Sequence, residues 1–154
     1  MIELDEVDRK ILSLLQQDGR MSNAELAEKI NLSASACLRR VRRLEDDGVI
    51  DRYAMILNPK AIGRTSNIFV EITLKSQSEE SLNEFEAAVA KCPGVMSCHL
   101  MSGDYDYMIR IAVSGATEYE HIHKSYLARL PYVDRIRSNF ALRTVCNRTT
   151  FKFA

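Results

Sequence analysis

The stretch that decides the fold is SNAELAEKINLSASACLRRVRRLEDDGVI, residues 22–50. Ser22 can accept a hydrogen bond from a free backbone N–H group of a first helix, and Glu25 can complete a capping box. Asn31 can adopt the left-handed conformation that closes this helix, and Ser33 can cap the next one. The stretch therefore predicts two helices joined by a turn of a few residues, which favours a steep crossing angle. An apolar stripe lets the first helix pack: Leu26, Ala27 and Ile30.

The second helix has one packing face and one free face, because residues follow each other at roughly 100° around its axis. The packing face carries Cys37, Val41 and Leu44, flanked by Ala34 and Leu38. The free face carries small and cationic residues, namely Ser35, Ala36, Arg39, Arg42 and Arg43. Arg40 lies at the border. Exposed arginine can bond to phosphate or to guanine, and small residues permit close approach to bases.

A DNA-reading helix-turn-helix is the interpretation we favour. We expect Ser35, Arg39 and Arg43 to read bases and Arg40 and Arg42 to bind phosphates. The full set of predicted DNA contacts is Ser33, Ser35, Ala36, Arg39, Arg40, Arg42 and Arg43. The alternative is a solvated helix face, on which the arginines pair with the acidic residues at 45–47, because charged runs are usually soluble surface. The capped preceding helix and the tight turn favour DNA.

The segments on either side complete a small domain, residues 1–57. Asp5 can cap a helix running to about Gln17, with apolar residues at helical spacing. Residues 49–57, VIDRYAMIL, predict a strand or hairpin arm, which would make the motif winged. A domain of this size is only marginally stable alone. Another part of the protein must then hold two copies of this domain in a fixed relative position.

The whole chain has 154 residues, with 21 basic and 21 acidic side chains. This balance argues against an indiscriminate polycation, although a local basic face can still bind phosphate. The four cysteines form no CxxC pair, and no secretory signal or membrane-spanning apolar run is present, so we expect a cytoplasmic protein with reduced thiols. The spacing of Cys98, His99, His121 and His123 matches no standard zinc pattern, and no metal site is predicted.

The second half of the chain changes periodicity after the turn at Asn58–Pro59. We expect residues 58–66 to be a linker and residues 67–154 a second domain. The predicted elements of this domain are a strand at 68–74, a helix at 79–91, strands at 95–101 and 105–113, a helix capped by Thr117 and stopped by Pro131, and a strand at 133–145. The order β-α-β-β-α-β is the ferredoxin-like arrangement, and the whole chain is therefore of the α+β class.

Right-handed crossovers would place both helices of this domain on one face of a four-stranded antiparallel sheet. The other face would stay uncovered. The strands carry apolar residues on both faces, for example Phe69 beside Val70 and Met108 beside Ile109. An uncovered apolar face predicts self-association.

The chain resembles the Lrp/AsnC family of transcription regulators over nearly its full length. The matching stretches are LDEVDRKIL with QDGR, CLRRVRRLEDDGVI, FVEITL and CHLMSGDYDYMIR. The resemblance implies a winged helix-turn-helix joined to a ligand-binding domain of the RAM (ACT-like) type, which dimerises through its sheets. It further implies that dimers assemble into tetramers, octamers or larger rings. A two-fold dimer would place its recognition helices about 34 Å apart on a pseudo-palindromic operator.

The resemblance also implies an effector, usually an amino acid, bound between neighbouring dimers near the loop that joins the second and third strands. A glycine allows close backbone approach, and an aspartate can pair with an ammonium group. The predicted effector contacts are Ser102, Gly103, Asp104, Tyr105 and Asp106 in this loop, with Asn139, Phe140 and Ala141 in the last strand. The alternative for the loop is a hairpin turn whose carboxylates cap backbone groups. Asn139 and Phe140 depart from the family pattern, which leaves leucine and other amino acids as candidates.

We therefore expect a sequence-specific regulator whose DNA binding or assembly responds to an amino acid, with no other cofactor. No nucleophile, phosphate loop or convergent histidine supports an enzyme. One alternative is an architectural, nucleoid-associated protein that wraps DNA without an effector. Another is a sensor that acts through a protein partner.

Overall fold

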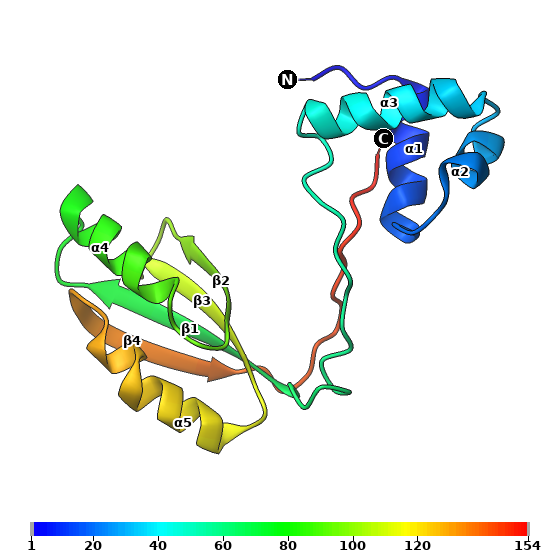
Figure 1. Ribbon diagram of the computed structural model, residues 1–154. Coiled ribbons are helices and arrows are strands. Elements are labelled where there is room, and N and C mark those ends of the chain that lie inside the picture. Colours follow the sequence, from blue (N-terminus) through cyan, green and yellow to red (C-terminus); the bar gives the residue numbers. More distant parts are fainter. Residues whose placement is uncertain (1, 154) are drawn as a thin grey trace. The chain divides into compact units, whose positions relative to one another are not determined.

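The computed structural model describes residues 2–153, so residues 1 and 154, the outer limits of the two predicted domains, lie outside the described residues. The chain divides into two compact units. Unit 1 comprises Met1–Ile56 with Cys146–Ala154, and unit 2 comprises Leu57–Val145. Helices alone build unit 1, and helices cover a sheet in unit 2 (Figure 1). This agrees with the predicted α+β class.

Unit 1 holds three helices, α1 (Glu6–Gln17), α2 (Asn23–Lys29) and α3 (Ala34–Asp46). The predicted caps are confirmed: Asp5 and Ser22 each form a capping box, and the Ser33 side chain accepts from the Ala36 N–H. The helices surround an apolar core in which Ile11, Cys37 and Leu44 are fully buried. Each helix contributes to this core, so their packing fixes the orientation of α3.

The arm predicted at residues 49–57 forms neither a strand nor a hairpin, and that prediction is wrong for this chain. Val49 and Ile50 stay close to α3, because both N–H groups donate to the Leu44 carbonyl. Beyond them, Met55 and Ile56 are 82% and 71% exposed. A strand requires a neighbour for its backbone hydrogen bonds, and no other segment of the described chain pairs with these residues.

The last residues of the chain belong to unit 1, although the sequence analysis assigned them to the second domain. The Phe151 N–H donates to Gln16 Oε1 over 2.6 Å, and Gln16 Nε2 donates to the Phe151 carbonyl over 3.2 Å. Phe153 packs against the core of unit 1. These contacts with α1 account for the placement of the segment after residue 145, which no local sequence pattern indicates.

Unit 2 contains a four-stranded antiparallel sheet in the order β2-β3-β1-β4. Its strands are β1 (Ser66–Leu74), β2 (Val95–Leu100), β3 (Tyr107–Val113) and β4 (Val133–Phe140). Its helices are α4 (Glu79–Val89), α5 (Ala116–Ser125) and the short η1 (Leu127–Arg129). Every second residue of β1 and β3 is buried under α4 and α5. The predicted β-α-β-β-α-β order and the single covered face are confirmed.

Several elements of unit 2 begin or end two residues away from their predicted bounds, and two further details differ from the predictions. Thr117 does not cap α5, because the helix begins at Ala116 after Gly115, without a side-chain cap. The Glu118 carboxylate instead accepts from the N–H and hydroxyl of Ser114, which keeps Ser114 outside the helix. The last strand ends at Phe140 rather than near residue 145, since its partner β1 extends no further than Ser66.

The uncovered face of the sheet is less apolar than predicted. Phe69 is 37% exposed there, and Met108 is half-buried. Glu71 lies between them on the same face, where it accepts from Asn139 over 3.0 Å and contacts Arg137 over 3.9 Å. Polar contacts thus run through the middle of this face, and a partner sheet would need complementary charges as well as apolar area.

Candidate DNA-binding and effector sites

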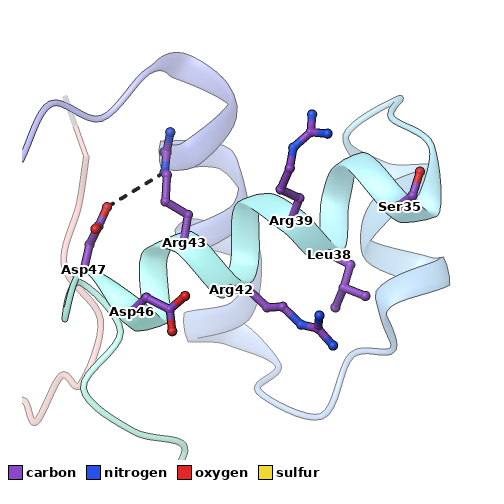
Figure 2. Close-up of a pocket in the computed structure, with 7 residues that line it drawn as sticks. All are labelled: Ser35, Leu38, Arg39, Arg42, Arg43, Asp46 and Asp47. Atoms are coloured by element: carbon purple, nitrogen blue, oxygen red, sulfur yellow. Dashed lines mark ion pairs between the residues drawn. The ribbon is translucent and has the colours of Figure 1, made fainter.

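The outer face of α3 carries a groove of about 490 Å³. Figure 2 shows the side chains that line it, which project from successive turns of the helix: Ser35, Leu38, Arg39, Arg42, Arg43, Asp46 and Asp47. Cations and small or apolar groups thus share one exposed helix face with two carboxylates at its C-terminal end. This combination can approach base edges and hold phosphate oxygens.

The structure shifts the predicted free face of α3 slightly around the helix. Leu38, assigned to the flank of the packing side, is 38% exposed and lines the groove. Ala36, assigned to the free face, is half-buried. Ser33 is occupied as the helix cap, and its hydroxyl lies 3.2 Å from that of Ser35. Sequence reasoning missed Leu38, because a difference of 100° per residue cannot fix the helix rotation to better than one position.

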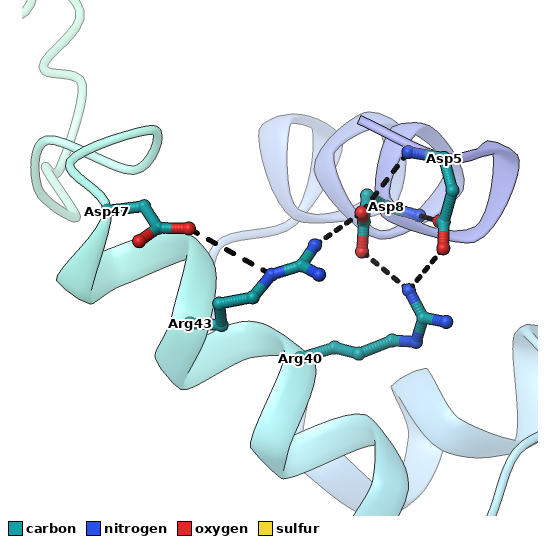
Figure 3. A network of polar contacts seen from close by, with 5 residues as sticks. All are labelled: Asp5, Asp8, Arg40, Arg43 and Asp47. Atoms are coloured by element: carbon teal, nitrogen blue, oxygen red, sulfur yellow. Dashed lines mark hydrogen bonds and ion pairs between the residues drawn. The ribbon is translucent and has the colours of Figure 1, made fainter. Parts of the chain in front are cut away.

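Two of the four arginines on α3 are held by carboxylates of the first helix region (Figure 3). Arg40 Nη1 lies 2.6 Å from Asp5 Oδ2 and 2.9 Å from Asp8 Oδ1. Arg43 donates to the other oxygen of Asp8 and lies 4.0 Å from Asp47. The Asp8 side chain is only 1% exposed. Arg40 and Arg43 therefore brace α3 against α1, a role that the sequence analysis did not assign to them.

The same carboxylates also form the capping box of α1. The Asp5 N–H donates to Asp8 Oδ2 over 3.2 Å, and the Asp8 N–H donates to Asp5 Oδ1 over 2.8 Å. The backbone N–H of Asp8, and after it the Arg40 guanidinium, hold the pKa of Asp5 below its ordinary value. These two carboxylates raise the pKa of Arg40 in turn. Asp5 and Arg40 therefore stabilise each other's charged form.

The turn between α2 and α3 is fixed by its backbone and by one side chain. Asn31 has a φ of 55°, so it adopts the predicted left-handed conformation. The Asn23 amide nitrogen donates to the Ala34 carbonyl over 2.8 Å, which ties the start of α2 to the start of α3. The angle at which α3 is presented follows from these contacts.

The loop predicted to contact an effector splits into two chemically different parts. Ser102, Gly103 and Asp104 are exposed, and Tyr105 is half-buried. Asp106 is only 7% exposed, and its carboxylate accepts from the Leu74 N–H and from Gln77 Nε2, both over 2.6 Å. Asp106 therefore fastens the loop to β1, as the alternative of a backbone-capping carboxylate anticipated. Asp104 makes no side-chain hydrogen bond within the described chain and keeps its charge accessible.

The remaining predicted effector residues lie at the opposite end of the sheet. The loop adjoins Tyr107, which pairs with Ile72, whereas Phe140 pairs with Ile68. These partners lie four positions apart along β1, which corresponds to about 14 Å. Phe140 is 49% exposed and packs edge-on against Tyr119, and the Ala141 N–H donates to the Asn67 carbonyl. Within one chain, the two groups of residues are therefore not brought together.

A second groove, of about 400 Å³, lies between α4 and the edge strand β2. Tyr107 donates to Glu86 at its wall over 2.7 Å. Burial, with the nearby Glu86 charge as a smaller cause, raises the pKa of Cys98 in this wall to about 11. Residues 2–153 contain no group of three or more side chains that could hold a metal ion. No helix within the same residues is long and apolar enough to cross a membrane.

Comparisons with known proteins assign both units. A model of the Lrp/AsnC ligand binding domain matches residues 67–151, and a model of winged helix-turn-helix DNA-binding domains matches residues 4–51. The leucine-responsive regulatory protein of Salmonella typhimurium is 41% identical over 152 residues, which cover 97% of this chain and 93% of that relative. The leucine-responsive regulatory protein of Escherichia coli is 40% identical with the same coverage.

Solved structures give the same assignment. A transcriptional regulator of Neisseria meningitidis, in complex with L-methionine, has a TM-score of 0.91 at 32% identity and covers 97% of both chains. The feast or famine regulatory protein of Mycobacterium tuberculosis, also complexed with L-methionine, has a TM-score of 0.86 at 32% identity, over 97% of this chain and 99% of that one. The chain belongs to the Lrp/AsnC family of transcription regulators, with an N-terminal helix-turn-helix DNA-binding domain and a C-terminal ligand-binding domain.

Proposed function

We propose that this regulator, acting in the cytoplasm, reads a specific operator with α3 and changes its DNA binding or assembly when a small amino acid binds. The observation that carries the DNA-reading role is the exposed groove on α3, which combines three arginines with small and apolar side chains and has Asp46 and Asp47 at one end. The first turns of a recognition helix meet the bases, and its later turns approach the backbone. The roles of individual residues follow from this polarity.

Ser35, Leu38 and Arg39 lie in the first half of α3 and are our base-contacting residues. A serine hydroxyl can bond to several bases, an exposed leucine can contact a thymine methyl group, and arginine can bond bidentately to guanine. Arg42, one turn later, is assigned to a phosphate. From the sequence alone, Arg43 is predicted to contact a base and Arg40 a phosphate. Their ion pairs with Asp8 favour a smaller direct role for both.

An alanine at Arg39 tests this assignment. Selection from a pool of random duplexes with the purified wild type would first supply an operator. Arg39→Ala should then weaken operator binding by about 1–3 kcal/mol and relax the preference at one base position. A phosphate role would instead give an equal loss on operator and random duplexes. Unchanged binding to both would refute a DNA contact at Arg39.

We further propose that the effector is an amino acid, leucine or another, held by the exposed part of the loop at 102–105. Asp104 can pair with the ammonium group, and the backbone N–H groups beside Gly103 can hold the carboxylate. The two relatives solved with L-methionine support an amino acid of this size. Because residues 139–141 lie at the other end of the sheet, they can contribute to the same site only from a second copy of the chain. The effector would then sit between subunits and link its binding to assembly.

The proposed assembly is a homodimer that forms tetramers, octamers or larger rings on a pseudo-palindromic operator. The uncovered sheet face supports dimerisation, because Phe69 and Met108 supply apolar area that α4 and α5 leave open. The charged residues of this face can fix how the two sheets align. Glu71 and Arg137 of one copy can meet the same pair on the other across a two-fold axis.

A thermal-shift screen of the purified full-length protein against the twenty amino acids tests the effector proposal, with size measurements for each ligand that raises the melting temperature. A ligand that binds only the folded state raises apparent stability. Selective stabilisation with a change in assembly is the expected result. No response at millimolar ligand would refute an amino-acid effector. Extended, sequence-tolerant footprints would then favour the architectural alternative.

A further inference from the structure

The arginines of α3 fall into two classes according to their partners. Arg40 and Arg43 contact Asp5 and Asp8, as described above. Arg43 is exposed like Arg39 and Arg42, but only Arg39 and Arg42 contact no carboxylate among the described residues. Charge counting along the helix would treat all four alike. The geometry separates them into two that are bound within the protein and two that are free for a ligand.

The bound pair cannot be released easily, because Asp8 is almost fully buried. A buried carboxylate that loses its cations is left with an uncompensated charge, which is strongly unfavourable. Each oxygen of Asp8 already has a guanidinium partner, and Oδ2 also accepts the Asp5 N–H. A DNA phosphate competing for Arg43 would therefore have to remove one of the two guanidinium partners of this buried carboxylate. Arg40 has a second carboxylate, Asp5, that holds it in the same way.

We propose that Asp8, assisted by Asp5, is a specificity-determining residue that withholds Arg40 and Arg43 from DNA phosphates. Binding without sequence preference grows with the number of phosphates neutralised, whereas base contacts alone distinguish sequences. Restricting α3 to Arg39 and Arg42 limits affinity for random DNA and leaves the base contacts unchanged. This inference rests on the proposed role of α3 as the recognition helix.

The salt dependence of duplex binding measures the number of phosphate contacts directly. Each additional contact steepens the plot of log affinity against log salt by about 0.9. The full-length Asp8→Asn variant keeps the side-chain shape and removes the charge that holds both arginines. On a random-sequence duplex at low salt, it should bind more tightly than the wild type, with a slope steeper by up to about 2 per bound recognition helix. The ratio of operator to random affinity should fall.

Glu79→Gln is the matched control. Glu79 begins α4 in unit 2, outside the groove on α3, is exposed, and forms no ion pair within the described chain, so this variant changes the net charge equally without releasing an arginine. Its slope should equal that of the wild type. A second control adds Arg40→Gln and Arg43→Gln to Asp8→Asn and should restore the wild-type slope. Circular dichroism and size measurements identify variants that fold and assemble normally.

Asp5→Asn keeps the inference testable if the buried substitution prevents folding, because Asp5 is half-exposed and holds only Arg40. Its slope should steepen measurably, by up to about 0.9, the effect of one phosphate contact. An unchanged slope in folded Asp5→Asn and Asp8→Asn would overturn the inference. So would equal losses on operator and random DNA, which would make Asp8 a structural brace only. Absence of duplex binding by the wild type would overturn the proposed function as well.

Discussion

Replacing Asp106 with alanine should lower the free energy of unfolding of unit 2 by about 2–4 kcal/mol. The carboxylate accepts two hydrogen bonds of 2.6 Å, from the Leu74 N–H and from Gln77 Nε2. Removing an acceptor of this kind leaves a buried donor unsatisfied, which costs about 1–3 kcal/mol, and more where the acceptor was charged. Leu74 is only 7% exposed, so its N–H carries most of this cost, whereas the exposed Gln77 can turn to water.

Urea unfolding, followed by far-ultraviolet circular dichroism at one fixed protein concentration, measures this change, provided that size measurements show the same assembly for variant and wild type. The matched control is Asp104→Ala, two residues away in the same loop. Asp104 is exposed and makes no side-chain hydrogen bond within the described chain, so its removal should change stability by less than about 0.5 kcal/mol. Equal stability of the two variants would refute the reasoning. Effector binding should show the opposite pattern to stability: Asp104→Ala should weaken it.

Three further predictions concern the core, the response to acid and the thiols. Leu44→Ala should destabilise unit 1 by about 2–5 kcal/mol, because the side chain is fully buried among the three helices; an unfolding midpoint that does not move would contradict this. Hydrogen bonds from Ser114 hold the pKa of Glu118 at about 2, so the stabilisation is complete above about pH 4.5 and is lost as the pH falls towards 2. Glu118→Gln should therefore be less stable than the wild type in thermal unfolding at pH 7, and the difference should shrink at pH 2–3. Maleimide labelling followed by mass spectrometry should modify the exposed Cys146 first, since Cys98, with a pKa of about 11, is ionised in only about one molecule in a thousand at pH 8; faster labelling of Cys98 would show that its burial is incomplete.

The parts of the fold that depend on neighbouring residues could be predicted from the sequence. Asp5, Ser22 and Ser33 cap the three helices of unit 1 as expected, because a cap requires only a side chain and the backbone two or three residues on. The alternating burial along β1 and β3 could also be predicted, since a sheet covered on one face requires apolar residues at every second position. Local chemistry and simple periodicity decide these elements.

The remainder depends on contacts between residues far apart in the sequence. No sequence pattern around Arg43 indicates that its partner is Asp8, 35 residues earlier. Arg43 was therefore predicted to contact a base. The segment at 51–57 has the composition of a strand but no neighbour in the described chain with which to form one. Asp106 was assigned to an effector by analogy, and its burial against Leu74 became visible only with the register of β1 and β3. In each case a tertiary partner decides the role.

Because the loop at 102–105 is separated from residues 139–141, the number of effector molecules that can bind depends on how the chains assemble. If one chain supplies one half of a site at each end of its sheet, complete sites form only where two chains meet. A closed ring then has as many sites as junctions, whereas an open string leaves an unfilled half at each terminus. The number of effector molecules bound per chain at saturation would therefore report whether the ring is closed. A ligand that stabilises junctions would also favour closed rings over strings, and the response to its concentration would become steeper as the ring completes.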